Sequence, residues 1–125
     1  MSQTLEPCPN SPNCVSSQSR DPGHQIQPLR FSIASDKAWH IWKELIQAQG
    51  NLVTFEADLL HLKAIFATPI FRFKDQMNCL LDQESRVIHV RSASHLGYWD
   101  LGVNRRRIEG LRSAFNQEIK VQHAY

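Results

Sequence analysis

The hydrophobic and polar positions of the chain divide it into a turn-rich start, a helix, a run of strands and a second helix. Ser35 has the character of a helix N-cap, Asp36 would lie in the first turn, and Gly50 with Asn51 forms an end signal. Between these signals apolar residues recur at helical spacing, at Ala38, Ile41, Trp42, Leu45 and Ile46. The pattern predicts an amphipathic helix with one buried face.

From residue 51 to residue 90 the spacing shortens to the alternation of strands. Strands are predicted at residues 52–55, 61–66, 71–73, 79–81 and 87–90, with residues 82–85 as a hairpin turn and a further short strand at 27–33. The short connections favour antiparallel pairing. Large aromatic side chains on these elements are expected in the core, namely those of Trp39, Trp42, Phe66, Phe71 and Phe73.

A second helix is predicted to begin at Asp100, which would cap it. Its apolar face would contain Leu101, Asn104, Ile108, Leu111 and Phe115. Arg105 and Glu109 are spaced for an i,i+4 ion pair. Two helices can cover one face of one sheet. The predicted fold class is therefore α+β, with an antiparallel sheet of about four to five strands packed by two helices.

The length of 125 residues fits a single domain. Turn-forming residues concentrate in residues 1–30, which we expect to form an extended, irregular, proline-rich arm packed on the domain. Residues 31–118 would form the α+β domain itself, and residues 119–125 a frayed tail.

Charge and composition exclude few classes of binding partner. The hydrophobic fraction of 42% and the charged fraction of 21% are ordinary for a globular protein. A net charge of +2 is too small to predict nucleic-acid binding. The run Arg105-Arg106-Arg107 lacks the aromatic ladder of single-strand binders, so it is interpreted as solvated helix charge.

The N-terminal segment MSQTLEPCPN has neither the basic nor the apolar region of a secretory signal. No stretch approaches the roughly 20 apolar residues that cross a bilayer. We therefore expect a cytoplasmic protein with no membrane span.

Cys8 and Cys14 lie close together in the arm and leave three alternatives open. They could form a disulfide if their Cα atoms come within roughly 7 Å. They could be free thiols, as most cytosolic cysteines are. They could also bind a metal with His24, although their spacing is not that of a zinc finger or ribbon. A structural or redox role is preferred over a metal site.

Polar groups crowd into one segment near the end of the predicted sheet. These candidate binding residues are Arg91, Ser92, Ser94, Tyr98, Asp100, Asn104 and Arg105. A helix that begins after a glycine-containing loop offers free N–H groups to an anion, and the two arginines would add donors. In the alternative interpretation Asp100 caps the helix, the serines satisfy the turn, and the glycines serve backbone geometry.

Two long and unusual motifs carry a family resemblance. One reads Cys-Pro-Asn-Ser-Pro-Asn-Cys-Val-Ser-Ser-Gln over residues 8–18. The other reads Val-Arg-Ser-Ala-Ser-His-Leu-Gly-Tyr-Trp-Asp-Leu-Gly-Val-Asn-Arg over residues 90–105. Together they closely resemble the family catalogued as domain of unknown function 1499, along nearly the whole chain from Cys8 to about Phe115. The resemblance implies no agreed chemistry.

The chain departs from the family pattern at two places. The resemblance implies an acidic cluster of the form Asp-Asp-x-Glu-Phe, of which only Asp75 remains in the segment of residues 75–79. It also implies an arginine at the position of His95. We interpret the joint loss as a structural ion pair replaced by a neutral pair, which would avoid a buried unpaired ion. A weakened carboxylate chemistry is the alternative.

These observations predict a non-catalytic binding or assembly module that uses the segment from Arg91 to Asn104. The partner would be another protein or a small anionic ligand, and no cofactor, metal or catalytic set is expected. One alternative is an enzyme or binder for a small anionic ligand at the same segment, with Asp100 or His95 moving a proton. Another is a redox-responsive protein acting through Cys8 and Cys14. A helix packed over a sheet can also enclose an apolar ligand.

Overall fold

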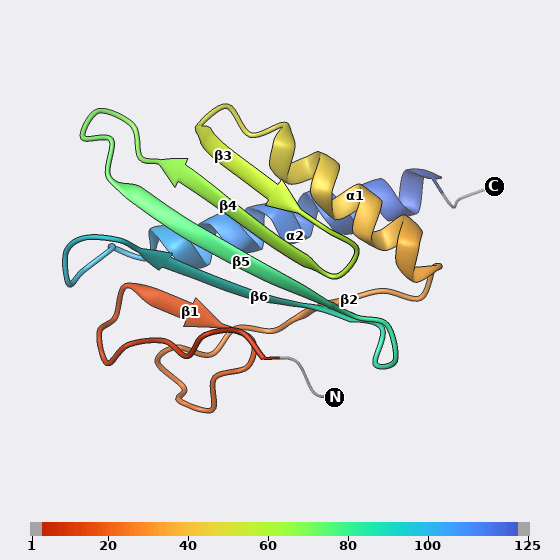
Figure 1. The fold of residues 1–125 in the computed structure, drawn as a ribbon, viewed down its shortest axis with the longest axis horizontal. Coiled ribbons are helices and arrows are strands. Elements are labelled where there is room, and N and C mark those ends of the chain that lie inside the picture. The colour runs from red at the N-terminus through yellow and green to blue at the C-terminus, as the bar shows by residue number, and fades with distance from the viewer. Residues whose placement is uncertain (1–3, 123–125) are drawn as a thin grey trace.

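Four strands in chain order form the body of the sheet in the computed structural model, which describes residues 4–122 (Figure 1). They are β3 (Leu52–Ala57), β4 (His61–Ala67), β5 (Lys74–Asp82) and β6 (Val87–Ser94), and each pairs antiparallel with the next. Two short strands, β1 (Cys14–Ser16) and β2 (Leu29–Arg30), pair antiparallel with the other edge of β6. The predicted α+β class with an antiparallel sheet is confirmed.

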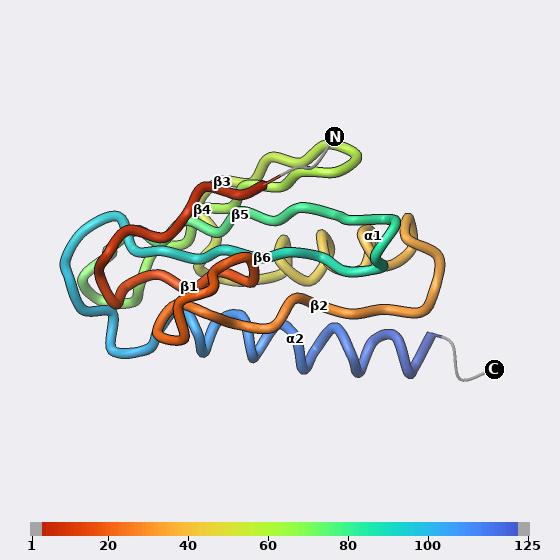
Figure 2. The backbone as a smooth tube through the Cα atoms, turned by 90° about the horizontal axis from the view of Figure 1, so that it is seen from below, coloured from red at the N-terminus to blue at the C-terminus, as the bar shows by residue number. Residues whose placement is uncertain are grey.

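Both helices, α1 (Ser35–Gln47) and α2 (Val103–Gln122), cover the same face of this sheet. Figure 2 shows the helices on one side of the strands and the first described residues on the other. Among residues 4–122, no helix is long and apolar enough to cross a membrane.

The core lies between the helices and the sheet, where Trp42 of α1 is fully buried. Its ring packs edge-on against Phe115 of α2 at 5.8 Å between centroids, and its Nε1 donates to the Sγ of Cys79 on β5 at 3.3 Å. Burial raises the pKa of the Cys79 thiol to about 12. The predicted core positions Trp39, Trp42 and Phe66 are confirmed. These large rings fill the layer between helices and sheet, which disfavours an enclosed apolar ligand.

The predicted strand at residues 71–73 is wrong, and so is the core position of its two phenylalanines. Phe71 and Phe73 are 72% and 52% exposed. Thr68 closes a turn here, because its N–H donates to the carbonyl of Phe73 at 2.7 Å and its hydroxyl accepts from the N–H of Phe73 at 2.9 Å. Alternating apolar residues in a tight turn therefore imitate a strand.

Other local predictions need correction as well. Ser35 is the first residue of α1, whose N-cap is Ala34 without a side-chain hydrogen bond. The predicted strand at residues 27–33 shortens to β2, since Pro28 lacks an N–H and the chain turns toward α1 after Phe31. The predicted strands at 79–81 and 87–90 lie in the second half of the longer β5 and in the first half of the longer β6.

The second helix also differs from its prediction. Leu101 is exposed and precedes α2, because the helix begins at Val103. The i,i+4 pair of Arg105 with Glu109 is absent from the described residues, in which Glu109 pairs with Arg112 at 2.8 Å. The helix also continues through residue 122, beyond the predicted start of a frayed tail, and residues 123–125 lie outside the described part of the chain.

The N-terminal arm is more ordered than its composition predicts. Residues 14–16 form β1 along β6, which sequence inspection missed because three residues are too few to show alternation. Two arginines of α2 hold the rest of the arm: Arg105 donates to the carbonyl of Gln25 at 3.0 Å, and Arg112 to that of Pro28 at 2.8 Å. Leu5 of the arm shares a cleft with residues of β3, β4 and β5.

The raised pKa of Cys79 predicts an unreactive thiol in the folded protein. At pH 8 only about one thiol in ten thousand would be ionised, and the thiolate is the reactive form. Titration of the oxidised protein with a thiol-specific disulfide reagent should therefore detect no thiol in buffer and one thiol per chain in denaturant. Rapid reaction of Cys79 in buffer would show that Trp42 does not shield it.

Candidate functional site

A buried polar network joins the end of β6 to the start of α2, and Asn104 lies at its centre. The Oγ of Ser92 donates to the Oδ1 of Asn104 at 2.6 Å. The Nδ2 of Asn104 in turn donates to the Oγ of Ser94 at 3.0 Å and to the Oδ2 of Asp100 at 2.9 Å. Ser92 and Asn104 are completely buried. Asn104 therefore fits the apolar face of α2 only because its amide is fully paired.

An ion pair between Arg107 of α2 and Asp75 of β5 extends this network across the sheet. The Nη2 of Arg107 lies 2.7 Å from the Oδ2 of Asp75, and the two side chains are only 10% and 2% exposed. The same guanidinium donates to the Oδ1 of Asn104 at 3.0 Å and stacks over the ring of Phe66 at 4.8 Å. The pair is thus buried, charged and supported on every side.

The interpretation of the arginine run as solvated charge is wrong for Arg107. Sequence reasoning missed the pair because three consecutive arginines look alike without a fold. Two signals pointed to it. Arg107 follows Asn104 by three residues and so shares its helical face, and Asp75 is the one carboxylate that the family resemblance leaves in its cluster.

Asp100 is engaged through both of its carboxylate oxygens. Its Oδ1 accepts from the N–H of Gly102 at 2.8 Å, and its Oδ2 accepts from the backbone N–H of Asn104 at 3.3 Å as well as from the side chain of Asn104. The predicted capping role of Asp100 agrees with these bonds. Gly97 and Gly102 adopt φ values of +84° and +78°, which glycine adopts without strain. Both oxygens of Asp100 thus hold the start of α2, as a structural role requires.

Arg91 and Arg105 do not converge on a common site. Successive residues of β6 point to opposite faces, so Arg91 lies on the face opposite to Ser92 and Ser94. Its Nη2 donates to the carbonyl of Pro7 at 3.3 Å, while Arg105 binds the arm from α2. The predicted clamp of two arginines around one anion therefore does not form in the structure.

Cys8 and Cys14 form a disulfide, with Cα atoms 5.7 Å apart. The bridge settles the alternatives for this state, because neither sulfur is a thiolate that could bind a metal or attack a substrate. Next to it, Asn13 donates from Nδ2 to the carbonyl of Gly97 at 2.6 Å, and its own carbonyl accepts from the N–H of Ser94 at 3.0 Å. The bridged segment therefore holds the chain that follows β6.

Exposed apolar side chains gather on two neighbouring loops at one end of the sheet. These are the β4–β5 loop (residues 68–73) and the β6–α2 loop (residues 95–102), joined by a hydrogen bond from the N–H of His95 to the carbonyl of Lys74 at 2.8 Å. Both extend beyond the strand ends at the left of Figure 1. The exposed residues are Ile70, Phe71 and Phe73 on the first loop and Leu96, Tyr98, Trp99 and Leu101 on the second.

We call these seven side chains the apolar rim. Of the predicted binding residues only Tyr98 belongs to it. Sequence reasoning missed the rest because it assigned the phenylalanines and Leu101 to the core. The density of aromatic residues in the two loops, which alternation did not explain, was the available signal.

The two departures from the family pattern meet beside the rim. The Nε2 of His95 lies 3.0 Å from the Oε1 of Gln76, as the interpretation of a neutral pair requires. The contact is exposed, so the avoidance of a buried ion is not its physical reason.

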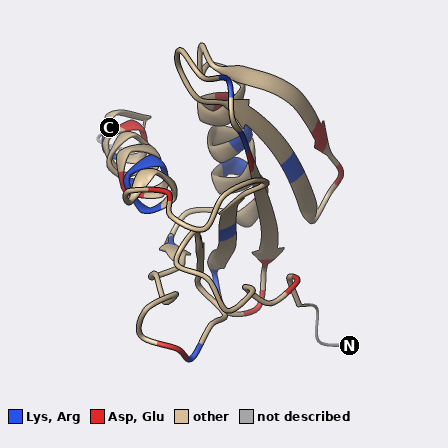
Figure 3. Ribbon diagram, turned by 90° about the vertical axis from the view of Figure 1, so that its left-hand side faces the viewer, with Lys and Arg blue, Asp and Glu red and all other residues tan. Residues whose placement is uncertain are grey.

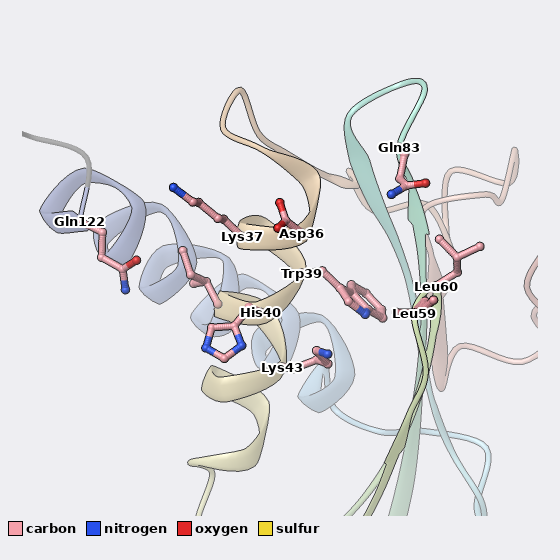
Figure 4. A pocket seen from close by; sticks show the side chains of 10 residues that line it. Asp36, Lys37, Trp39, His40, Lys43, Leu59, Leu60, Gln83 and Gln122 are labelled. Atoms are coloured by element: carbon pink, nitrogen blue, oxygen red, sulfur yellow. The ribbon is translucent and has the colours of Figure 1, made fainter.

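A cleft of about 810 Å³ lies at the other end of the molecule. Figure 4 shows Trp39 pointing from α1 toward Leu59 and Leu60, whereas Lys37 and His40 extend from the other side of the helix. The indole N–H of Trp39 already donates to the carbonyl of Asp58 at 3.0 Å. Charged and polar residues line the cleft as well, and the indole N–H of Trp39 is already occupied by its hydrogen bond.

Removal of Arg107 is expected to destabilise the protein strongly. Arg107→Ala leaves the buried carboxylate of Asp75 without its partner, which should lower the free energy of unfolding by about 3–5 kcal/mol in urea titrations. The neighbouring exposed change Arg106→Ala should stay within about 0.5 kcal/mol of the wild type. The double change Asp75→Leu with Arg107→Met should recover most of the loss, because it removes both charges. A loss below about 1 kcal/mol for Arg107→Ala would contradict the role assigned to the pair.

Reduction of the disulfide is expected to loosen the chain after β6. Opening a loop this short should lower the free energy of unfolding by about 2 kcal/mol. The amide hydrogen of Ser94, which bonds to Asn13, should exchange faster with solvent after reduction. The variant Cys8→Ala with Cys14→Ala serves as the control, since reductant should not change it. Equal stability of the wild type with and without reductant would rule out this coupling.

The comparisons with known proteins agree with the motifs. The model of the family described as protein of unknown function (DUF1499) matches residues 4–115. No curated protein and no solved structure shows a match to the chain. Because the family model covers most of the chain, including both motifs and the whole buried network, the protein belongs to the DUF1499 family.

Proposed function

We propose that this protein is a non-catalytic binding module that docks to its partner through the apolar rim. The observation that carries the proposal is the exposure of seven large apolar side chains on two adjoining loops. Leu96, Trp99 and Leu101 are each more than two-thirds exposed, at 71%, 72% and 83%. Large apolar side chains that gather on the surface in this way mark interaction sites in proteins.

The polar side chains predicted to form the binding surface support the rim from inside the molecule. Ser92, Ser94, Asp100 and Asn104 bond to one another, and Asn13 fixes the carbonyl of Gly97. These hydrogen bonds hold the β6–α2 loop in place. The proposal therefore keeps the predicted segment and moves its contact groups from the polar to the apolar side chains. The same bonds disfavour the alternative of an anion-processing enzyme.

Backbone strain in the loops agrees with a role beyond folding. Ile70 and Leu101 adopt φ values of +69° and +54°, in the left-handed region that costs a residue with a side chain about 1–2 kcal/mol. A β-branched residue is especially uncommon there. Both residues are exposed, so no buried contact compensates this cost.

A second candidate function, redox response, is favoured by the disulfide. Asn13 lies next to Cys14 and bonds directly to the loop that carries Trp99, so the oxidation state of the bridge could control the position of that loop. Disulfides persist mainly in oxidising compartments. A bridge that is always present would argue against the cytoplasmic location expected from the N-terminal segment. In the cytoplasm, the disulfide would form only when an oxidant is present.

Site-specific photo-crosslinking tests the docking proposal. A photoreactive amino acid replacing Phe71 or Leu96 should crosslink to a partner in extracts of the source cells. The same group at Leu59, which is 85% exposed on the β3–β4 turn at the other end, should not. Crosslinks of equal yield from all three positions, or none from the rim, would refute the proposal.

A further inference from the structure

We propose that the partner of the apolar rim is an anionic lipid surface, onto which the protein docks with the rim inserted into the interface. This inference rests on the proposed docking function and names its partner. It concerns a peripheral contact made by loops, which is distinct from a membrane-spanning segment.

The shape of the rim suits a lipid surface better than the face of another protein. The two loops extend beyond the ends of their strands (Figure 1), and their large apolar side chains are exposed. Binding energy between proteins concentrates in side chains that fill pockets on a matching surface. Exposed apolar side chains need no matching pocket in a bilayer, because lipid chains adapt around them.

The chemistry of the rim is that of a membrane interface. Tyr98 and Trp99 pack edge to face at 5.0 Å between ring centroids, and Phe71 and Phe73 stack at 5.6 Å. Tyrosine and tryptophan are enriched where one end of the side chain is apolar and the other wet, as at lipid headgroups. Leu96 and Leu101 add aliphatic groups of the kind that enter the boundary between headgroups and acyl chains.

Charge complementarity selects an anionic surface. Residues 68–74 and 95–106 contain four basic residues, Arg72, Lys74, Arg105 and Arg106, and a single acidic residue. That acid is Asp100, whose oxygens accept hydrogen bonds from the chain itself. Figure 3 views the molecule from this end and marks the charged residues along the chain. An anionic headgroup layer would meet cations around the rim with little repulsion.

Co-sedimentation with vesicles tests the inference on the full chain. The wild type should sediment with vesicles of equal parts phosphatidylcholine and phosphatidylglycerol, and much less with phosphatidylcholine alone. High salt should release it, because exposed charges are screened. The emission of Trp99 should shift to shorter wavelength on binding, whereas the buried Trp39 and Trp42 should not contribute to the shift.

Variants separate insertion from charge. Trp99→Ser should weaken vesicle binding by about tenfold or more, because it removes one large apolar side chain from the interface. Arg72→Gln and Lys74→Gln should each weaken it by about fivefold. Leu59→Ser is the control, since it removes an exposed leucine from the opposite end and should leave binding unchanged.

The outcomes distinguish the two proposals. Vesicle binding that Trp99→Ser abolishes and Leu59→Ser preserves supports a lipid surface. In a second outcome, the wild type fails to bind anionic vesicles while a photoreactive group at position 71 or 96 crosslinks to a protein. That result would overturn the lipid inference and leave the docking proposal intact. Absence of both vesicle binding and crosslinks would overturn both. Equal weakening by Leu59→Ser would show that sedimentation does not depend on the rim.

Discussion

The buried ion pair of Arg107 with Asp75 is the interaction on which the arrangement of α2 against the sheet depends. Two opposite charges in a low-dielectric layer tolerate little displacement, because each would otherwise stand unpaired. The pair lies between α2 and β5, and Arg107 also bonds to Asn104. Together with the bond between Asn104 and Ser92, the pair holds the first turns of α2 against β5 and β6. The loop that leads into α2 must then bridge a defined distance from the end of β6.

This constraint explains why the segment after β6 is so rich in polar residues. A chain that leaves a strand and enters a helix within eight residues, 95–102, carries many backbone groups that lack ladder or helix partners. The oxygens of Asp100, Ser94 and Asn104 satisfy them or one another. The polar side chains point inward and hold the loop, whereas the large apolar side chains of the same loop are exposed to solvent. The loop is thus polar in its construction and apolar in its surface.

The arm and the loops form one connected unit at this end of the molecule. The disulfide closes the segment that contains Asn13, and Asn13 bonds to Gly97. The β6–α2 loop bonds through His95 to Lys74, the residue of β5 that directly follows the β4–β5 loop. Each link is short and direct. A change in the state of the cysteines therefore has a physical path to the exposed aromatic residues. The large cleft beside Trp39 lies outside this path, which is why its size does not make it the stronger functional candidate.

The sequence by itself determined the two helices, the β5–β6 hairpin, the α+β class and the membership of the family. These features depend on local periodicity or on contiguous motifs, which the chain displays without any knowledge of its fold. Ala38, Ile41, Trp42 and Ile46 are buried as their spacing predicts, because a helix places such positions on one face.

Only the tertiary structure decided which side chains are buried and which distant segments cover them. Phe71 and Phe73 alternate like strand residues, yet they stack on each other and stay largely exposed. Three identical side chains follow one another at positions 105–107, yet among the described residues only that of Arg107 pairs with a buried carboxylate. Arg91 and Ser92 are neighbours in sequence and lie on opposite faces of β6. The physical reason is the same in each case: burial and pairing are set by segments distant in the chain, and local periodicity contains no information about which segment will lie opposite.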